Sequence, residues 1–225
     1  MTAWEGTAAE LKPQTGKALG RWPVVYALAW TLSQHPRPLG RRTLVQETGI
    51  TEMTVRTHLN KLRSAGLVQM AKAGTSLTAP GREAFAPLKE RVRWVGALAL
   101  RDLALDDHGA AALLRSSSQE LKESWRYRDA AVREGATGAL LLVRAEGGWS
   151  FSDEPLPLGE RYPEDAALLE RALSRAGVRA QEGDALVVAF GPEPSTARRG
   201  LWRVVVELLP PSKLALHSPT KSRGG

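Results

Sequence analysis

Residues 49–68 of the chain read GITEMTVRTHLNKLRSAGLV, and this stretch decides the fold of the first half. Gly49 can adopt a positive φ at little cost, so it predicts a tight turn. Thr51 follows in the position of a helix cap, and Gly66 is a typical helix stop. The sequence therefore predicts a turn followed by a helix over 51–65.

The flanking segments complete a recognisable order of elements. Upstream, apolar residues recur at helical spacing until a proline-rich stretch ends the helix, and a short second helix precedes Gly49. Downstream, two short apolar runs surround a basic glycine turn, which predicts a two-stranded wing. The residues involved are Val24, Val25, Leu28, Ala29 and Leu32, then the stop at 36–40, the helix at 41–47 with Leu44 and Val45 inward, and the strands at 67–71 and 76–78 around 72–74. Helix, helix, turn, helix and wing predict a winged helix-turn-helix.

The helix over 51–65 has two faces in a helical projection. Val55, Leu59 and Leu62 form a buried stripe with His58 at its edge. The opposite face carries Met53, Arg56, Thr57 and Asn60, flanked by Thr54 and Lys61. Arginine can bond a guanine edge and asparagine an adenine edge, while methyl groups contact thymine, so this set suits the major groove of DNA. The alternative is that the face is polar only because it is solvated.

Positive charge is confined to the same half. Residues 1–89 contain 12 Lys/Arg and 5 Asp/Glu, a net charge of +7, whereas the remainder contains 19 of each. A basic module is typical of nucleic-acid binding, because neutralised phosphates release condensed counterions. The candidates for phosphate contact are Arg41 and Arg42 at the start of the second helix, Lys72 at the wing tip, and also Arg37, Arg63 and Arg82. Each could equally be a plain surface charge.

Two motifs in this half resemble a known family. The segment GITEMTVRTHLNKLRSAGLV resembles the recognition-helix region of winged-helix transcriptional regulators of the MarR, ArsR and PadR kind. LTAPGREAF at 77–85 resembles the LTxxGRE segment that follows their second wing strand and opens the next helix. The resemblance implies double-stranded DNA as the partner.

The second half mixes strands and helices without a regular βαβ repeat, which predicts an α+β fold. Expected strands lie after Trp94 and at 110–115, 139–143, 149–151 and 185–190, and expected helices at 119–135, 164–176 and 196–209, the last capped by Ser195. The predicted organisation is a flexible arm at 1–20, the winged domain at 21–90, an α+β domain at 91–210 and a disordered tail at 211–225. At this length, each of the two large domains is expected to have its own core.

The phrases RYRDAAVREGATGALLLV and GDALVVAFGP resemble an uncharacterised domain found behind winged helices in some archaeal regulators. The resemblance implies a sensing or oligomerising module. Arg126, Arg128 and Asp129 share one predicted helix and are candidates for binding an anionic small-molecule effector. The alternative is an ordinary salt-bridged surface helix.

Composition and missing motifs exclude several classes of protein. The chain has no cysteine, no apolar run long enough to cross a membrane and no signal-peptide pattern, so a cytoplasmic protein is expected. The histidines are scattered, and the nucleotide-binding and nucleophile motifs are missing, so we expect no enzyme, no cofactor and no metal. Arginine outnumbers lysine 23 to 8 and asparagine occurs once, which favours a heat-adapted source or a GC-rich genome.

The sequence as a whole therefore predicts a DNA-binding transcriptional regulator. We expect a homodimer that reads two half-sites, with its contact in the segment 82–94 through Phe85, Leu88, Val92 and Trp94. Two alternatives remain open, namely a winged helix that binds RNA or protein, and an enzyme tethered to nucleic acid.

Overall fold

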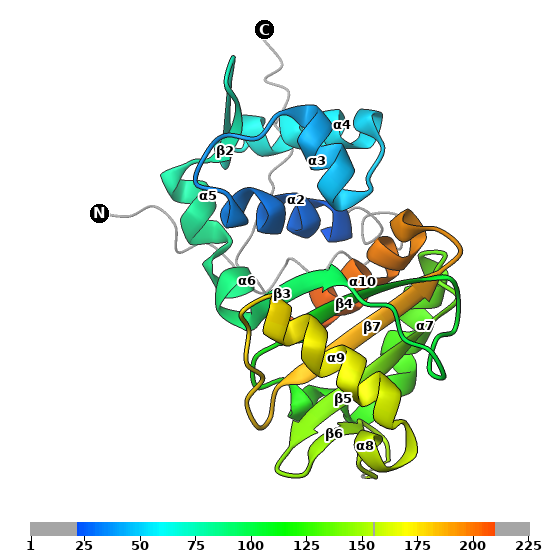
Figure 1. Cartoon of the computed structure of the whole chain (residues 1–225). Helices are drawn as coiled ribbons and strands as arrows, with labels where there is room; N and C mark the ends of the chain where they lie inside the picture. The colour runs from blue at the N-terminus through cyan, green and yellow to red at the C-terminus, as the bar shows by residue number, and fades with distance from the viewer. Residues whose placement is uncertain (1–21, 155, 210–225) are drawn as a thin grey trace, which may run out of the picture.

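The N-terminal half consists of helices followed by a hairpin. The computed structural model of the chain describes residues 22–154 and 156–209, so the expected arm at 1–20 and tail at 211–225 lie outside the described residues. The elements are α2 (Trp22–Gln34), α3 (Arg41–Thr48), α4 (Glu52–Ser64), β1 (Val68–Ala71), β2 (Gly74–Leu77), α5 (Ala79–Ala84) and α6 (Ala86–Arg91). Their order is the one that the sequence predicts (Figure 1).

The C-terminal half is built on an antiparallel sheet with strand order β3-β4-β7-β5-β6. Its elements are β3 (Val92–Ala97), β4 (His108–Leu114), the 3-10 helix η1 (Ser118–Glu123), α7 (Ser124–Arg133), β5 (Gly138–Ala145), β6 (Gly148–Phe151), α8 (Leu158–Arg161), α9 (Pro163–Arg175), β7 (Ala185–Gly191) and α10 (Pro194–Leu208). The predicted α+β fold class is confirmed.

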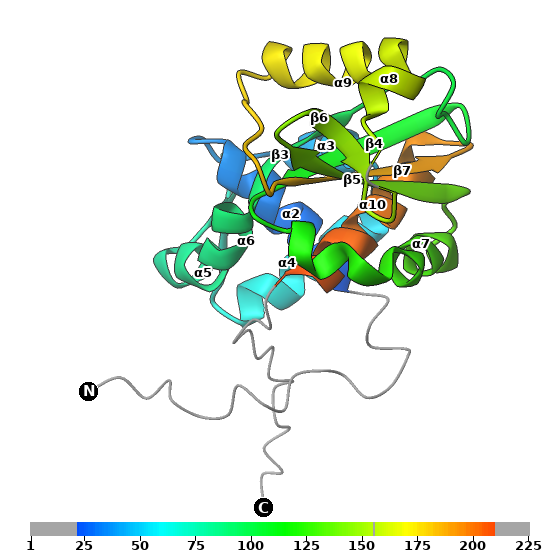
Figure 2. The same ribbon diagram turned by 90° about the horizontal axis from the view of Figure 1, so that it is seen from below.

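The central strand β7 is buried along its whole length, and its side chains alternate between two apolar layers. Ala185, Val187 and Ala189 face α10, whereas Leu186, Val188 and Phe190 pack with the apolar side chains of α9. Figure 2 shows the two layers, with α9 on one side of the sheet and α7 and α10 on the other. Helices on both faces explain why β7 has no polar face in the sequence.

Helix α10 joins the two halves. One of its sides covers β4 and β7, and another packs against α2. Helix α2 is consequently buried nearly all round, including Tyr26, Ala27 and Trp30 as well as the apolar residues that its periodicity predicts. A single apolar cluster runs from the N-terminal helices to the sheet, so the expectation of two separate cores is wrong.

Most of the apolar side chains in the expected dimer segment are buried within the chain itself. Phe85, Leu88 and Val92 are 3%, 2% and 1% exposed and belong to this shared core, so they are not available to a second copy. Phe85, Leu88 and Val92 therefore cannot carry the dimer contact expected in the 82–94 segment, whereas Trp94 is only partly buried, and the homodimer itself stays a prediction. Of the described helices, none is long and apolar enough to cross a membrane.

Local details differ from the sequence predictions at three helix starts. The Thr51 hydroxyl donates to Thr54 Oγ1 at 2.9 Å and caps no backbone amide. Glu193, rather than Ser195, caps α10, and it forms a capping box with Thr196. The helix expected over 119–135 is divided into η1 and α7, with Gly135 at φ 92° after it.

Candidate nucleic-acid interface

Helix α4 presents the two faces that the projection predicts. Val55, Leu59 and Leu62 are fully buried and His58 is 7% exposed, with its Nδ1 2.8 Å from the carbonyl oxygen of Thr54. The opposite side is solvent-exposed at Met53, Arg56, Thr57, Asn60 and Lys61, and partly exposed at Thr54. Met53 is 75% exposed, so the described part of the chain leaves its side chain free to contact a partner.

The first turns of α3 and α4 add backbone donors next to this face. Gly40, the residue before α3, has no side chain to cap the helix, and Thr51 makes no cap bond to α4. Amide groups of an uncapped helix N-terminus are suited to binding phosphate, because they carry partial positive charge and lack intrahelical partners. These donors were not predicted; the glycine at position 40 is the signal in the sequence.

The basic side chains of the candidate interface are exposed. Arg41 makes a long 3.8 Å ion pair with Glu52, and both groups are well exposed to solvent. Arg42, Arg56, Lys61 and Lys72 have no ion pair with any other described residue. Their positive charge is therefore available to an anionic partner.

The β1–β2 hairpin, which the sequence predicts to be the wing, is anchored to the loop that precedes α3. Leu39 and Thr75 exchange two backbone hydrogen bonds of 2.8 Å, which add a bridge beside the β1–β2 hairpin. Gly74 has φ 130°, and a Cβ at this position would lie 2.7 Å from the backbone of Leu39. Glycine is thus required where the loop crosses the hairpin, and Lys72 lies exposed in the turn just before it.

Three residues of the LTAPGREAF segment, Thr78, Gly81 and Arg82, make identifiable local contacts. Thr78 caps α5 by accepting a hydrogen bond of 3.0 Å from the amide of Gly81. A Cβ on Gly81 would lie 1.9 Å from the carbonyl oxygen of Leu67. Arg82 is exposed and donates one hydrogen bond of 2.8 Å to the carbonyl of Leu77, so it links α5 to the end of β2, and its expected phosphate contact stays a prediction.

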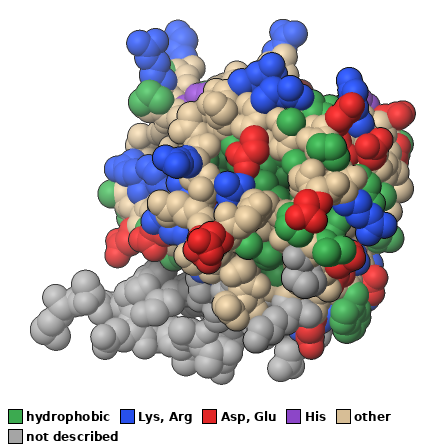
Figure 3. All heavy atoms as spheres, turned by 60° about the horizontal axis from the view of Figure 1, so that its bottom comes forward, with side chains coloured by type: hydrophobic (Ala, Val, Ile, Leu, Met, Phe, Trp, Pro, Cys, Tyr) green, Lys and Arg blue, Asp and Glu red, His purple; other side chains and the backbone are tan. Residues whose placement is uncertain are grey.

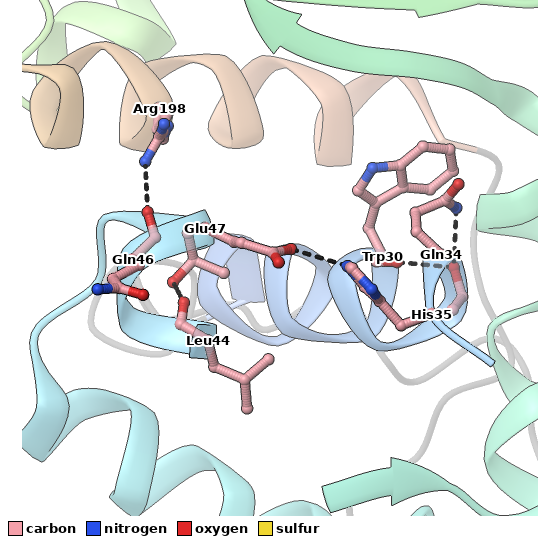
Figure 4. A network of polar contacts seen from close by, with 9 residues as sticks. Trp30, Gln34, His35, Leu44, Gln46, Glu47 and Arg198 are labelled. Carbon is pink, nitrogen blue, oxygen red and sulfur yellow. Dashed lines mark hydrogen bonds and ion pairs between the residues drawn. The ribbon is translucent and has the colours of Figure 1, made fainter. Parts of the chain in front are cut away.

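The turn between α3 and α4 is held from the C-terminal half (Figure 4). Arg198 of α10 donates a hydrogen bond of 3.2 Å to the carbonyl oxygen of Gln46, in the last turn of α3. Gly49 adopts φ 68°, and a Cβ there would lie 3.3 Å from both Arg198 Nη1 and Ser195 Cα. The sequence did not predict this contact, because it joins residues about 150 positions apart.

The predicted effector residues do not converge. Arg126 pairs with Glu123 at 2.7 Å and Arg128 with Asp153 at 2.9 Å, and both pairs are largely exposed. Side chains two positions apart on a helix project about 160° away from each other, so the two guanidinium groups lie on different sides of α7. The geometry matches the alternative that the sequence left open, a salt-bridged surface helix.

Comparison with known proteins adds two family matches. Residues 31–92 match the model of the CggR N-terminal DNA binding domain. Residues 105–208 match a domain of unknown function (DUF4443). The resemblance of the first half to helix-turn-helix regulators and of the second half to an uncharacterised domain is confirmed.

A solved structure of similar fold is that of a hypothetical protein from Pyrococcus horikoshii OT3. The two sequences are 24% identical, and the match covers 82% of this chain and 91% of the Pyrococcus chain, with a TM-score of 0.61. This likeness extends the fold comparison across both halves. No functionally curated protein is detectably similar to the chain.

Proposed function

We propose that the protein is a transcriptional regulator that binds double-stranded DNA as a homodimer and reads bases with α4. The observation that carries the proposal is the exposed face of α4, where Met53, Arg56 and Asn60 project beside the uncapped starts of α3 and α4. Guanidinium and amide side chains read base edges, while backbone amides and Lys72 serve phosphates. The match to a DNA binding domain model supports the same function.

The C-terminal domain is proposed to control how the helix-turn-helix is held and paired, rather than to catalyse a reaction. Helix α10 packs on α2 and fixes the α3–α4 turn through Arg198, so any shift of α10 would change the position of α4. A small-molecule effector that binds the C-terminal domain would act on α4 by this route. The exposed pairs of Arg126 and Arg128 give no reason to place it on α7.

A selection from a random duplex library tests the function. The full-length protein is expected to enrich a short sequence, and Arg56→Ala and Asn60→Ala are expected to lose part of that preference. Arg171→Ala, an exposed arginine on α9, is the matched control and should enrich the same sequence as the wild type. No enrichment above a nonspecific background, or preferential recovery of RNA from a mixed library, would contradict the proposal.

A further inference from the structure

The outer side of α7 carries two large apolar residues that the described part of the chain leaves uncovered. Trp125 is 62% exposed and Val132 is 50% exposed. They are seven residues apart, so they lie on one line along the helix, with Asp129 beside that line. The opposite side of α7, at Ala130 and Ala131, is buried against the rest of the C-terminal domain.

An exposed tryptophan aligned with a valine is typical of a contact surface rather than of a solvated helix. Tryptophan buries a large area at low cost in conformational entropy and is enriched at the energetic centres of protein interfaces. The remaining surface around α7 is charged with both signs. Figure 3 shows the same mixture on the side of the sheet domain, where basic and acidic groups are interspersed with hydrophobic ones.

One flank of α7 carries charges whose order would place opposite signs together if a second α7 ran antiparallel to it. Glu123, which directly precedes α7, and Arg126, Asp129 and Arg133 are exposed and alternate in sign along this flank. Arg128 projects from another side of the helix, where it pairs with Asp153. When a second copy runs antiparallel and the two-fold axis passes near position 128, Glu123 lies opposite the region of Arg133 of the other copy. The same arrangement places Arg126 near Asp129 and Trp125 near Val132, each with its two-fold equivalent.

We propose that α7 is the self-association surface of this protein, and that two copies pair through antiparallel α7 helices centred near residue 128. The apolar line supplies the contact area, and the alternating charges set its direction and register. Asp129 and Arg133 have no ion pair with another described residue, so both are available to the second copy. The exposed pair of Glu123 with Arg126 can exchange partners at little cost.

This surface deepens the proposed function, since a two-fold dimer presents two copies of α4 to duplex DNA. A helix of ten residues is only about 15 Å long and covers less than a standard interface, so the dimer is expected to be weak and concentration-dependent. Its test needs no DNA. A failure here is therefore distinguishable from a failure of DNA binding.

Sedimentation equilibrium of the full-length protein over increasing concentration is the test. The wild type is expected to approach a dimer, and Trp125→Glu to raise the dissociation constant by roughly tenfold or more. Arg133→Glu and Glu123→Arg should each weaken the dimer by placing like charges opposite one another. The double variant Glu123→Arg/Arg133→Glu should recover it, because the opposite charges face each other again.

Two outcomes would overturn the inference. The first is a wild-type protein that stays monomeric at the highest concentration it tolerates in solution, or a dimer that Trp125→Glu leaves intact. The second is a double variant no better than its single parents, which would exclude the antiparallel register. Arg171→Glu, a charge reversal on α9, is the control and should dimerise as the wild type does. If the wild type is a monomer and Trp125→Glu lowers its free energy of unfolding, the apolar line packs against the same chain and the inference is wrong.

Discussion

Arg198 donates a hydrogen bond of 3.2 Å to the carbonyl oxygen of Gln46, and this contact ties the last helix of the chain to the helix-turn-helix. Gln46 is among the last four residues of α3, whose carbonyls lack intrahelical partners. A guanidinium at this end also suits the negative end of the helix dipole. The C-terminal domain therefore caps the helix that precedes the predicted recognition helix.

The close packing of the α3–α4 turn predicts an asymmetric response of two glycines to the same substitution. Gly49 and Gly177 have φ 68° and 66°, so alanine at either should cost about 1–2 kcal/mol for the left-handed conformation. Only Gly49 has the atoms of α10 at 3.3 Å, whereas nothing lies within 4 Å of a Cβ at Gly177. Gly49→Ala should therefore lower the free energy of unfolding more than Gly177→Ala in urea titrations. Equal losses would show that α10 does not confine the turn.

The close approach at Gly81 predicts a larger loss of stability. Its new Cβ would lie 1.9 Å from the carbonyl oxygen of Leu67, which is backbone and cannot rotate away. Gly81→Ala should cost about 3 kcal/mol or more, because the wing and α5 must separate. The control Gly40→Ala has open space and φ −69°, so it should change stability little. Thermal unfolding followed by circular dichroism measures both, and a tolerated Gly81→Ala would contradict the packing described.

Glu134 predicts a pH-dependent effect where the two halves meet. It lines a cavity of about 50 Å³ with Val24 and Trp202, and burial raises the pKa of its carboxyl, although Arg203 and Arg199 act in the opposite direction. A raised pKa in the folded state means that the stabilising contribution is present at low pH and is lost as the pH rises through that pKa.

Glu134→Gln should therefore be more stable than the wild type at neutral pH. The difference should vanish below about pH 4, where the glutamic acid is neutral in both folded and unfolded chains. Urea unfolding at a series of pH values measures it, with the exposed Glu182→Gln as control. A variant less stable than the wild type at neutral pH would mean that the ionised carboxylate stabilises the fold.

Local signals in the sequence were sufficient for the helix-turn-helix. Gly49 predicted its turn, and the spacing of Val55, Leu59 and Leu62 predicted which side of α4 is buried. What could not be predicted is what each half packs against. Trp30 is buried because α2 lies on α10, and Leu39 forms its bridge with Thr75, a hairpin residue 36 positions further along the chain. Local periodicity carries no information about such distant partners.

The same limit explains why the dimer contact was predicted at residues that are buried in the core. Phe85 and Leu88 are apolar residues between two predicted domains, and nothing local distinguishes a dimer contact from a core shared by both domains. The hydrogen bond from Arg82 to the Leu77 carbonyl was likewise not predictable, because it depends on where the end of β2 lies. The register of Arg126 and Arg128 along a helix could have shown that they diverge.

Two lysines predict a purely electrostatic effect on DNA binding. Lys61 and Lys72 are exposed and unpaired among the described residues, at the C-terminal part of α4 and in the wing turn. Replacing either with alanine should weaken binding to all duplexes alike and reduce the slope of log K against log salt by about 0.9 for each phosphate lost. Fluorescence anisotropy at several salt concentrations measures the slope. A slope that matches the wild type in both variants would remove these lysines from the interface.

The most direct test of the central claim, that α4 reads the major groove, combines a protein change with a base change. The selected duplex is prepared with 7-deazapurines, which lack the N7 acceptor in the major groove, and its affinity is measured for the wild type and for Arg56→Ala. The wild type is expected to lose about 1–3 kcal/mol at one purine, and Arg56→Ala to show no further loss at that purine. Full affinity of the wild type for every substituted duplex, or the same loss in both proteins at every position, would contradict the account.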